Sequence, residues 1–553
     1  MRTIYRKPKL KFINVYFLLL LMLISLALQA QEQGKYFSKK QYTKTSLPVF
    51  SALKKQLPTP VFDQDSNLVN CYWKAWELAC RNFYEPNAEN GFVSQYIDAA
   101  FNANTFLWDG SFMTMFCNYA YPLVPGICTL DNFYAKQHET GEICREIVRS
   151  TGKDYAPWVN VENKPLFSRF GNEYGGQSWS VQYLGRDIPL PNPVLTLDAL
   201  DHPILAWAEL ESYRVTGNKE RLKTVFEPLV HYYNALQKYI RQGNGLYMTD
   251  WAGMDNSPRN CYIQGGGTAV DISSEMVLFA RNLSEIARIL KKEKEMKQYQ
   301  QEANDLSAII NKKMWDPEKS FYYDLTMAGE FVPVKTIGSF WTLLGQVATK
   351  NQAYKLVEEL ENPNTFKRKH RVPTLAADQE KFDPLGGYWC GSIWAPTNTM
   401  VIRGLEKYGY DSLAYVIAMN HLENVAQIFV KTGTIWENYA ADSIVHGNQA
   451  RNDFVGWSGI APILYFIEYA IGLKPDASEN TLVWNVRSNK RCGMENFRFN
   501  SHITSLIAEP SANQLKIRAI SDGQFKLNVT YHGVTKKAII HPGNNYLTIR
   551  TKE

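Results

Sequence analysis

Four short stretches of the sequence contain carboxylates or paired aromatic residues. They are FLWDGSF (106–112), MTDWAGMDNSPR (248–259), YWCGSIWAP (388–396) and TIWENYAAD (434–442). The Gly and Pro residues in and near these stretches disfavour a regular helix. Carboxyl groups serve as general acids and bases, and Trp and Tyr rings stack on the apolar faces of sugars. The four stretches therefore indicate acid–base chemistry in an aromatic cleft.

Two aspartates of the second stretch, Asp250 and Asp255, have an ordinary alternative as solvated loop residues that cap nearby backbone groups. Asp255 lies between Met254 and Pro258 and near Trp251, an apolar setting that disfavours the charged form and raises the pKa. We expect this setting to favour the protonated form of Asp255, and Asp250 to cap the loop or contact ligand.

Glu437 of the fourth stretch is the complementary carboxylate. Asn438 and Tyr439 follow it, and their polar groups can form hydrogen bonds to a charged carboxylate. We therefore expect Glu437 to stay ionised.

Other chemistries lack their motifs. The sequence has no G-x-S-x-G (GWSG at 456–459 lacks the last Gly), no G-x-x-x-x-G-K, no H-E-x-x-H and no dinucleotide fingerprint. Its 8 cysteines form neither a C-x-x-C nor a Cys/His cluster, which argues against a zinc site and a dense disulfide framework. We expect no cofactor and no catalytic metal, although calcium could brace a loop.

The N-terminus reads as a secretory signal peptide. Residues 1–30 combine a basic start, an apolar run and a cleavage position near Ala30, the alternative being an uncleaved anchor helix. The formal net charge is +6, and residues 1–30 hold five basic and no acidic residues. The nearly neutral remainder excludes nucleic acid as a partner. We expect a secreted or periplasmic protein with no stable membrane insertion after cleavage.

The elements that must position these residues are mostly helices. Apolar residues at three and four spacing run from 66 to 473, in pairs such as 272–291 with 294–314, 336–349 with 351–361 and 392–408 with 410–428. So many hairpins favour an all-α toroid or solenoid. Residues 31–65 read as an irregular arm, and 474–553, with period-two alternation, as a small antiparallel β-domain.

In this order, DNSPR, WCGSIW and ENY resemble the motifs of glycoside hydrolase family 63, the processing α-glucosidases and mannosylglycerate hydrolases, and of the related trehalases. The resemblance covers roughly residues 100–470. It implies an (α/α)6 toroid, an oligosaccharide substrate, and inversion at an α-glucosidic or α-mannosidic bond, with Asp255 as the acid and Glu437 as the base. Cys390 and Ser392 stand where the family usually has Arg and Pro, and ENYAADS lacks the usual continuation.

The resemblance also suggests which residues bind the substrate. They are Trp108, Asp109, Trp251, Arg259, Tyr388, Trp389, Trp394 and Trp436. Asp109 could instead cap a helix, Arg259 could form a structural ion pair, and Trp394 could belong to the core. Gln177, Trp179 and Asp201 could shape the leaving-group side, although a structural role is favoured for them.

Two alternatives to a glycosidase remain at this stage. A polysaccharide lyase on a similar barrel needs a Tyr/His or Lys/Arg set to abstract a proton, and the four stretches carry no suitable His. A non-catalytic glycan-binding protein would keep the aromatic cleft but has no need of two facing carboxylates.

Overall fold

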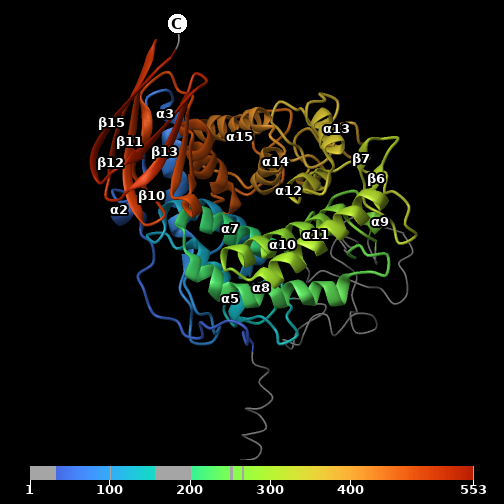
Figure 1. The fold of residues 1–553 in the computed structure, drawn as a ribbon. Helices are drawn as coiled ribbons and strands as arrows, with labels where there is room; N and C mark the ends of the chain where they lie inside the picture. The colour runs from blue at the N-terminus through green and yellow to red at the C-terminus, as the bar shows by residue number, and fades with distance from the viewer. Residues whose placement is uncertain (1–32, 100, 156–200, 249–252, 264–266, 552–553) are drawn as a thin grey trace, which may run out of the picture.

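The computed structural model describes residues 33–551 except 100, 156–200, 249–252 and 264–266 (Figure 1). The predicted signal peptide and the candidates Gln177, Trp179, Asp250 and Trp251 lie outside the described residues.

Six helices with mostly buried residues form the centre of the helical body. They are α4 (Leu107–Cys117), α7 (Leu205–Thr216), α10 (Val270–Ile289), α12 (Trp341–Leu344), α14 (Ala395–Lys407) and the π-helix η7 (Ile460–Ile471). Every residue of α4 and of η7 is buried, which is typical of helices enclosed by other helices. Each helix contacts the next in this order, and η7 contacts α4.

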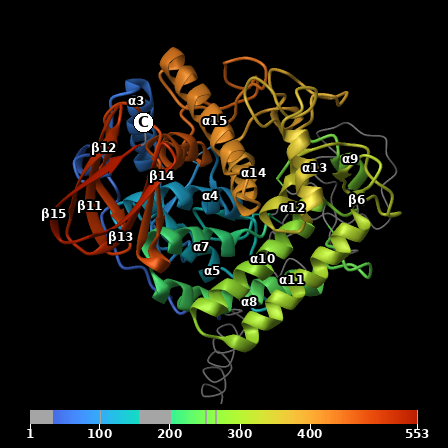
Figure 2. The ribbon, with the colours of Figure 1, turned by 45° about the horizontal axis from the view of Figure 1, so that its top comes forward.

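Six further helices alternate with these along the chain. They are α3 (Ser66–Arg81), α5 (Thr129–Ala135), α8 (Lys219–Ile240), α11 (Glu293–Lys313), α13 (Lys350–Leu360) and α15 (Asp411–Thr432). All of them except the almost fully buried α5 leave one face exposed. In α11 the buried side chains are Tyr299, Ala303, Leu306, Ser307 and Ile310, at the spacing of one helix face. The long α10 and α11 lie side by side in Figures 1 and 2.

The connections at the two ends of the inner helices differ in length. Except between α4 and α5, the chain needs only a few residues from an inner to the next outer helix, as at 217–218, where Gly217 takes a left-handed φ of 66° and the Asn218 side chain caps α8. Segments that lead into an inner helix are long, such as 241–269 and 361–394. The four chemically suggestive stretches all lie in or beside these long segments.

The remaining elements of the helical body are short. The helices are α2 (Phe50–Leu53), α9 (Asn260–Ile263), η1 (Asn118–Ala120), η2 (Gly126–Cys128), η4 (Ile337–Phe340), η5 (Tyr388–Cys390) and η6 (Trp457–Gly459). The paired strands are β2 (Phe83–Tyr84) with β3 (Tyr96–Ile97), β4 (Asn104–Phe106) with β5 (Glu146–Val148), and β6 (Trp315–Asp316) with β7 (Phe321–Tyr322).

Helix pairs 272–291 with 294–314 and 392–408 with 410–428 are confirmed within a few residues by α10, α11, α14 and α15. The helix expected at 336–349 is wrong in length. That segment splits into η4 and the four-residue α12, and its chain turns at Gly345.

The C-terminal region contains two sheets that stand beside α3 (Figures 1 and 2). The first has the order β1-β10-β11-β12-β15 and is antiparallel; the second has the order β14-β13-β9-β8. Their strands are β1 (Thr59–Phe62), β8 (Leu473–Asp476), β9 (Thr481–Val486), β10 (Cys492–Phe499), β11 (His502–Ser511), β12 (Gln514–Ser521), β13 (Phe525–Tyr531), β14 (Val534–Ile540) and β15 (Gly543–Arg550), with the short helix η8 (Ala477–Glu479) between β8 and β9. Phe499 of the first sheet and Phe525 of the second meet edge to face, 5.0 Å between ring centroids.

Two expectations for these regions are wrong in detail. The β-region is not purely antiparallel, because β13 pairs with β9 in parallel. The arm at 31–65 is not irregular throughout, because β1 pairs with β10 from Thr59↔Glu495 to Phe62↔Cys492. Alternation over four residues was too short to identify that strand.

None of the helices described is long and apolar enough to cross a bilayer.

Candidate active site

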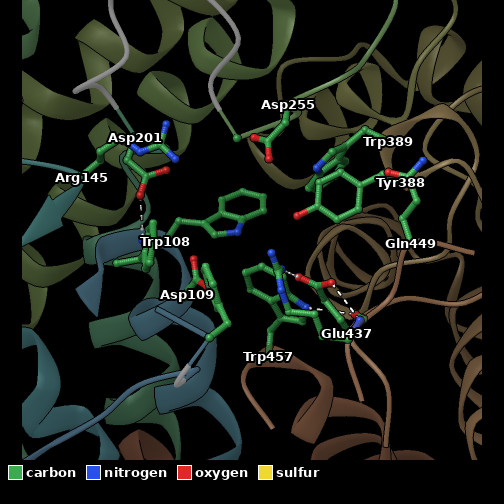
Figure 3. A pocket seen from close by; sticks show the side chains of 14 residues that line it. Trp108, Asp109, Arg145, Asp201, Asp255, Tyr388, Trp389, Glu437, Gln449 and Trp457 are labelled. Carbon is green, nitrogen blue, oxygen red and sulfur yellow. Dashed lines mark hydrogen bonds and ion pairs between the residues drawn. The ribbon is translucent and has the colours of Figure 1, made fainter. Parts of the chain in front are cut away.

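A cavity of about 330 Å³ lies where the long segments leading into the inner helices converge (Figure 3). Its lining residues are Phe101, Phe106, Trp108, Asp109, Arg145, Asp201, Gly253, Asp255, Tyr388, Trp389, Glu437, Gln449, Arg451 and Trp457. Segments before α4, α7, α10, α14 and η7 all contribute. The helix pattern therefore brings together side chains that are up to 356 positions apart in the sequence.

Asp255 enters the cavity from a turn that its neighbours hold in place. The Asn260 side chain donates to the carbonyls of Met254 (2.7 Å) and Asp255 (3.1 Å). Asn256 donates to the Gly387 carbonyl and accepts from the Trp389 amide, both at 2.9 Å. These bonds fix the Asp255 turn against the loop that carries Trp389.

The surroundings of Asp255 favour its protonated form. Burial, helped by the negative charges of Glu437 and Glu146, raises its pKa to about 7, against the opposing charges of Arg145 and Arg451. A carboxyl group with this pKa can hold and release a proton near neutral pH.

Glu437 reaches the same cavity from another side, as Figure 3 shows. Its carboxylate is buried and forms an ion pair with the Arg451 guanidinium, Oε1 to Nη1 at 2.5 Å. The Trp457 ring nitrogen and the Ser458 hydroxyl donate to its carbonyl. Burial raises the pKa of Glu437, and the charge and hydrogen bonds of Arg451 oppose that rise.

The hydrogen-bond partners expected for Glu437 are wrong. The Asn438 side chain accepts from the Ser392 hydroxyl at 2.9 Å, and the Tyr439 hydroxyl accepts from the Trp436 amide at 3.2 Å. Both side chains brace the loop, and the carboxylate is held by a residue 14 positions further on.

Trp108 and Asp109 form another part of the wall, in the first turn of α4. The Trp108 amide donates to Asp201 Oδ2 at 2.9 Å, so Asp201 both lines the cavity and fixes the start of the helix. Asp109 does not cap α4, because the N-cap is Phe106. Its Oδ1 has no hydrogen-bond partner among the described residues, and burial beside Asp201 and Asp98 raises its pKa.

Tyr388 and Trp389 present their side chains to the cavity, and Trp394 supports them from behind. The Trp389 and Trp394 rings stack with centroids 4.4 Å apart and planes at 6°, and the Trp394 ring nitrogen donates to the Tyr388 carbonyl. Trp394 is fully buried and does not line the cavity. Its predicted contact with substrate is corrected to a packing role.

Two further predicted binding residues also lie away from the cavity. Arg259 is fully buried in an ion pair with Asp271 (2.5 Å) and reaches Asp324 at 3.5 Å, so its donors face other carboxylates. Trp436 stacks on His446 at 3.7 Å and donates to Thr432, which turns its ring outward. The motifs did not reveal these partners, because Asp271, Asp324, Thr432 and His446 lie outside them.

The cavity also contains residues that the sequence analysis did not name as candidates for binding or catalysis. They are Phe101, Phe106, Arg145, Gln449, Arg451 and Trp457. The only sequence signal for the two arginines is their position in polar segments that lead into inner helices. Across the described ranges, no group of three or more His, Cys, Asp and Glu side chains could hold a metal ion.

Comparisons with known proteins find similarity to glycoside hydrolases. Residues 198–444 match the model of the mannosylglycerate hydrolase MGH1-like glycoside hydrolase domain. An uncharacterized protein of Borreliella burgdorferi is 26% identical over 369 residues, which cover 64% of this chain and 77% of that protein. A mannosylglycerate hydrolase of Thermus thermophilus is 28% identical over 182 residues, which cover 32% of this chain and 42% of that enzyme.

Among solved structures, a GH63 mannosylglycerate hydrolase from Thermus thermophilus in complex with glucose superposes with a TM-score of 0.52 at 19% identity. The match covers 71% of this chain and 99% of that chain. This likeness shows a shared fold.

Proposed function

Because this chain carries a glycoside hydrolase domain of the family 63 type, related to the trehalases, we propose that it is an inverting glycosidase that cleaves α-glucosides or α-mannosides of oligosaccharides. The observation that carries the proposal is the pairing of Asp255, with a pKa of about 7, and Glu437, held by a cation, in one cavity.

We also propose that the helices form an (α/α)6 toroid. The contacts that pass from α4 through α7, α10, α12 and α14 to η7 and back to α4 support a closed ring. In such a ring the long segments share one rim, and residues as far apart in the sequence as Asp255 and Glu437 can face one another.

Export through the predicted signal peptide, with cleavage near Ala30, belongs to the same proposal.

The reaction needs one protonated and one ionised carboxyl group. Asp255 gives its proton to the glycosidic oxygen while the bond from that oxygen to the anomeric carbon breaks. A water molecule attacks the anomeric carbon from the opposite face, and Glu437 takes the proton that this water loses. The Asp109 carboxyl group, which is buried and has an unpartnered oxygen among the described residues, binds hydroxyl groups of the sugar.

Inversion makes a prediction about the product. Proton NMR of an α-glycoside digest should show the β-anomer first, before mutarotation, and the two carboxyl groups should stand about 6.5 to 9.5 Å apart in a crystal structure. Aryl and natural α-glucosides and α-mannosides are the substrates to screen, with Glu437→Gln protein as the blank. An initial α-anomer would contradict the proposed mechanism.

A further inference from the structure

Arg451 is a partly exposed residue that contacts a buried carboxylate of the cavity. Its guanidinium bonds Glu437 Oε1 at 2.5 Å, and its amide donates to Glu437 Oε2 at 3.3 Å. The Glu437 amide in turn donates to the Arg451 carbonyl at 2.9 Å. The Arg451 side chain is 48% exposed, whereas that of Glu437 is 1% exposed.

The far side of the guanidinium packs on an aromatic ring. Its central carbon lies 4.6 Å from the centroid of Phe101, which comes from the segment before α4. Backbone bonds, an ion pair and ring stacking together define one position for the Arg451 charge, although the side chain is partly open to solvent.

We propose that Arg451 is a positioning residue that orients Glu437 and keeps its carboxylate ionised near neutral pH. This role rests on the proposed glycosidase reaction. A backbone-anchored cation suits it, because both Glu437 oxygens are engaged from one residue and the lone pairs that remain can still bind the attacking water.

The charged and titratable groups that face the two carboxyl groups come from several segments. They are Asp109, Arg145, Glu146, Asp201, Tyr388 and Arg451. Two of these groups are cations, and they act differently. Arg145 and Arg451 both lower the pKa of Asp255, whereas the cation that lowers the pKa of Glu437 is Arg451.

This difference supplies a matched pair of variants, Arg451→Gln and Arg145→Gln. Glu437 must be ionised, so its pKa sets the acid limb of the kcat/KM profile; Asp255 must be protonated, so its pKa sets the alkaline limb. Removing a positive charge raises a carboxyl pKa. Arg451→Gln should therefore move both limbs to higher pH by about 0.5 to 1 unit, and Arg145→Gln should move only the alkaline limb.

Arg451→Lys separates charge from geometry. It keeps the cation but loses the planar fork of the guanidinium, so both limbs should stay near their wild-type positions while kcat falls. Circular dichroism and melting temperature confirm that each variant is folded. If Arg451→Gln lowers kcat but leaves both limbs in place, Arg451 is merely structural and the proposal is overturned.

A readout without turnover separates this proposal from the function on which it rests. In protein labelled with ¹³C at Asp and Glu carboxyl carbons, Asp255→Asn and Glu437→Gln difference spectra assign the two signals. The pKa of Glu437 should be higher in Arg451→Gln than in wild-type protein and unchanged in Arg145→Gln. An unchanged Glu437 titration in Arg451→Gln refutes the role of Arg451; the expected titration in a protein that hydrolyses no glycoside refutes the glycosidase proposal alone.

Discussion

Buried charged groups lie at both ends of the inner helices, and the pKa values of the carboxyl groups shift in opposite directions at the two ends. At one end lies the cavity with Asp255 and Glu437. At the other lies an ionic cluster formed by Glu211, Arg214, Arg403 and Glu468, towards the C-terminal ends of α7, α14 and η7. Glu468 accepts from Arg214 and from Arg403, each at 2.6 Å.

Burial alone does not decide the charge of a carboxyl group. It raises the pKa of Asp255 and of Glu468 alike, but the guanidiniums of Arg214 and Arg403 bind Glu468 directly and hold its pKa well below the usual range. Asp255 instead lies near a second carboxylate. The comparison teaches that one end is arranged to stay ionised and the other to exchange protons.

The largest expected effect is on catalysis, at the cavity end. Asp255→Asn and Glu437→Gln should each lower kcat at least about a hundredfold, because each removes a group that transfers a proton. Initial rates of sugar release on the preferred substrate measure this. Near wild-type turnover in either variant would show that the roles are wrongly assigned.

At the cluster end the same kind of change should act on stability. Glu468→Gln removes the fully buried anion that Arg214 and Arg403 share and leaves them Glu211, so it should lower the free energy of unfolding by about 3 to 5 kcal/mol, as measured by urea denaturation. Turnover per folded molecule should stay at the wild-type level. A loss of turnover without a loss of stability would contradict this division between the ends.

The pH dependence of stability should have opposite slopes at the two ends. The folded-state pKa of Asp255 lies above its unfolded value, so this group costs stability as pH rises from about 4 to 7. The free energy of unfolding of Asp255→Asn, relative to wild type, should therefore rise by on the order of 4 kcal/mol between pH 4 and pH 8.

Glu468 has a lowered folded-state pKa, so its stabilisation is complete above its unfolded pKa of about 4.3 and is lost as pH falls further. The stability gap between wild type and Glu468→Gln should thus shrink below about pH 4. Urea midpoints across pH 3 to 8 test both slopes, and parallel slopes would refute the contrast.

The smallest effect is expected at the edge of the cluster. Lys474 pairs with Glu406, and both side chains are partly exposed. Lys474→Gln should cost at most about 1 kcal/mol, since solvent screens the pair. A loss as large as that of Glu468→Gln would show that the whole network, rather than its buried centre, carries the stability.

Sequence patterns predicted those parts of the fold that depend on local periodicity. α10 and α11 follow from apolar spacing, because a helix face repeats every three or four residues. Neither β1 nor the parallel pairing of β9 with β13 could be foreseen, because strand partners are chosen by tertiary packing between segments far apart in the sequence.

The same limit applies to the site. The cavity is lined by both predicted catalytic carboxyl groups and by four of the predicted binding residues, Trp108, Asp109, Tyr388 and Trp389. These residues were predictable because a motif specifies residue type and local turn geometry. Arg259 belongs to one of the same motifs, yet its guanidinium forms an ion pair with Asp271. Arg451 belongs to no motif, and its role at the site is seen only in the structure, where its loop brings the guanidinium to the Glu437 carboxylate.

The pairing of β1 with β10 bears on how the chain is made. Residues 59–62 leave the ribosome more than 400 residues before Cys492 to Glu495, so β1 lacks its partner strand for most of synthesis. Until then β1 is an unpaired extended segment able to join a wrong neighbour. Because β1 is synthesised so long before β10, we expect β1, rather than the helical pairs, to be the segment that most needs protection by a chaperone during synthesis.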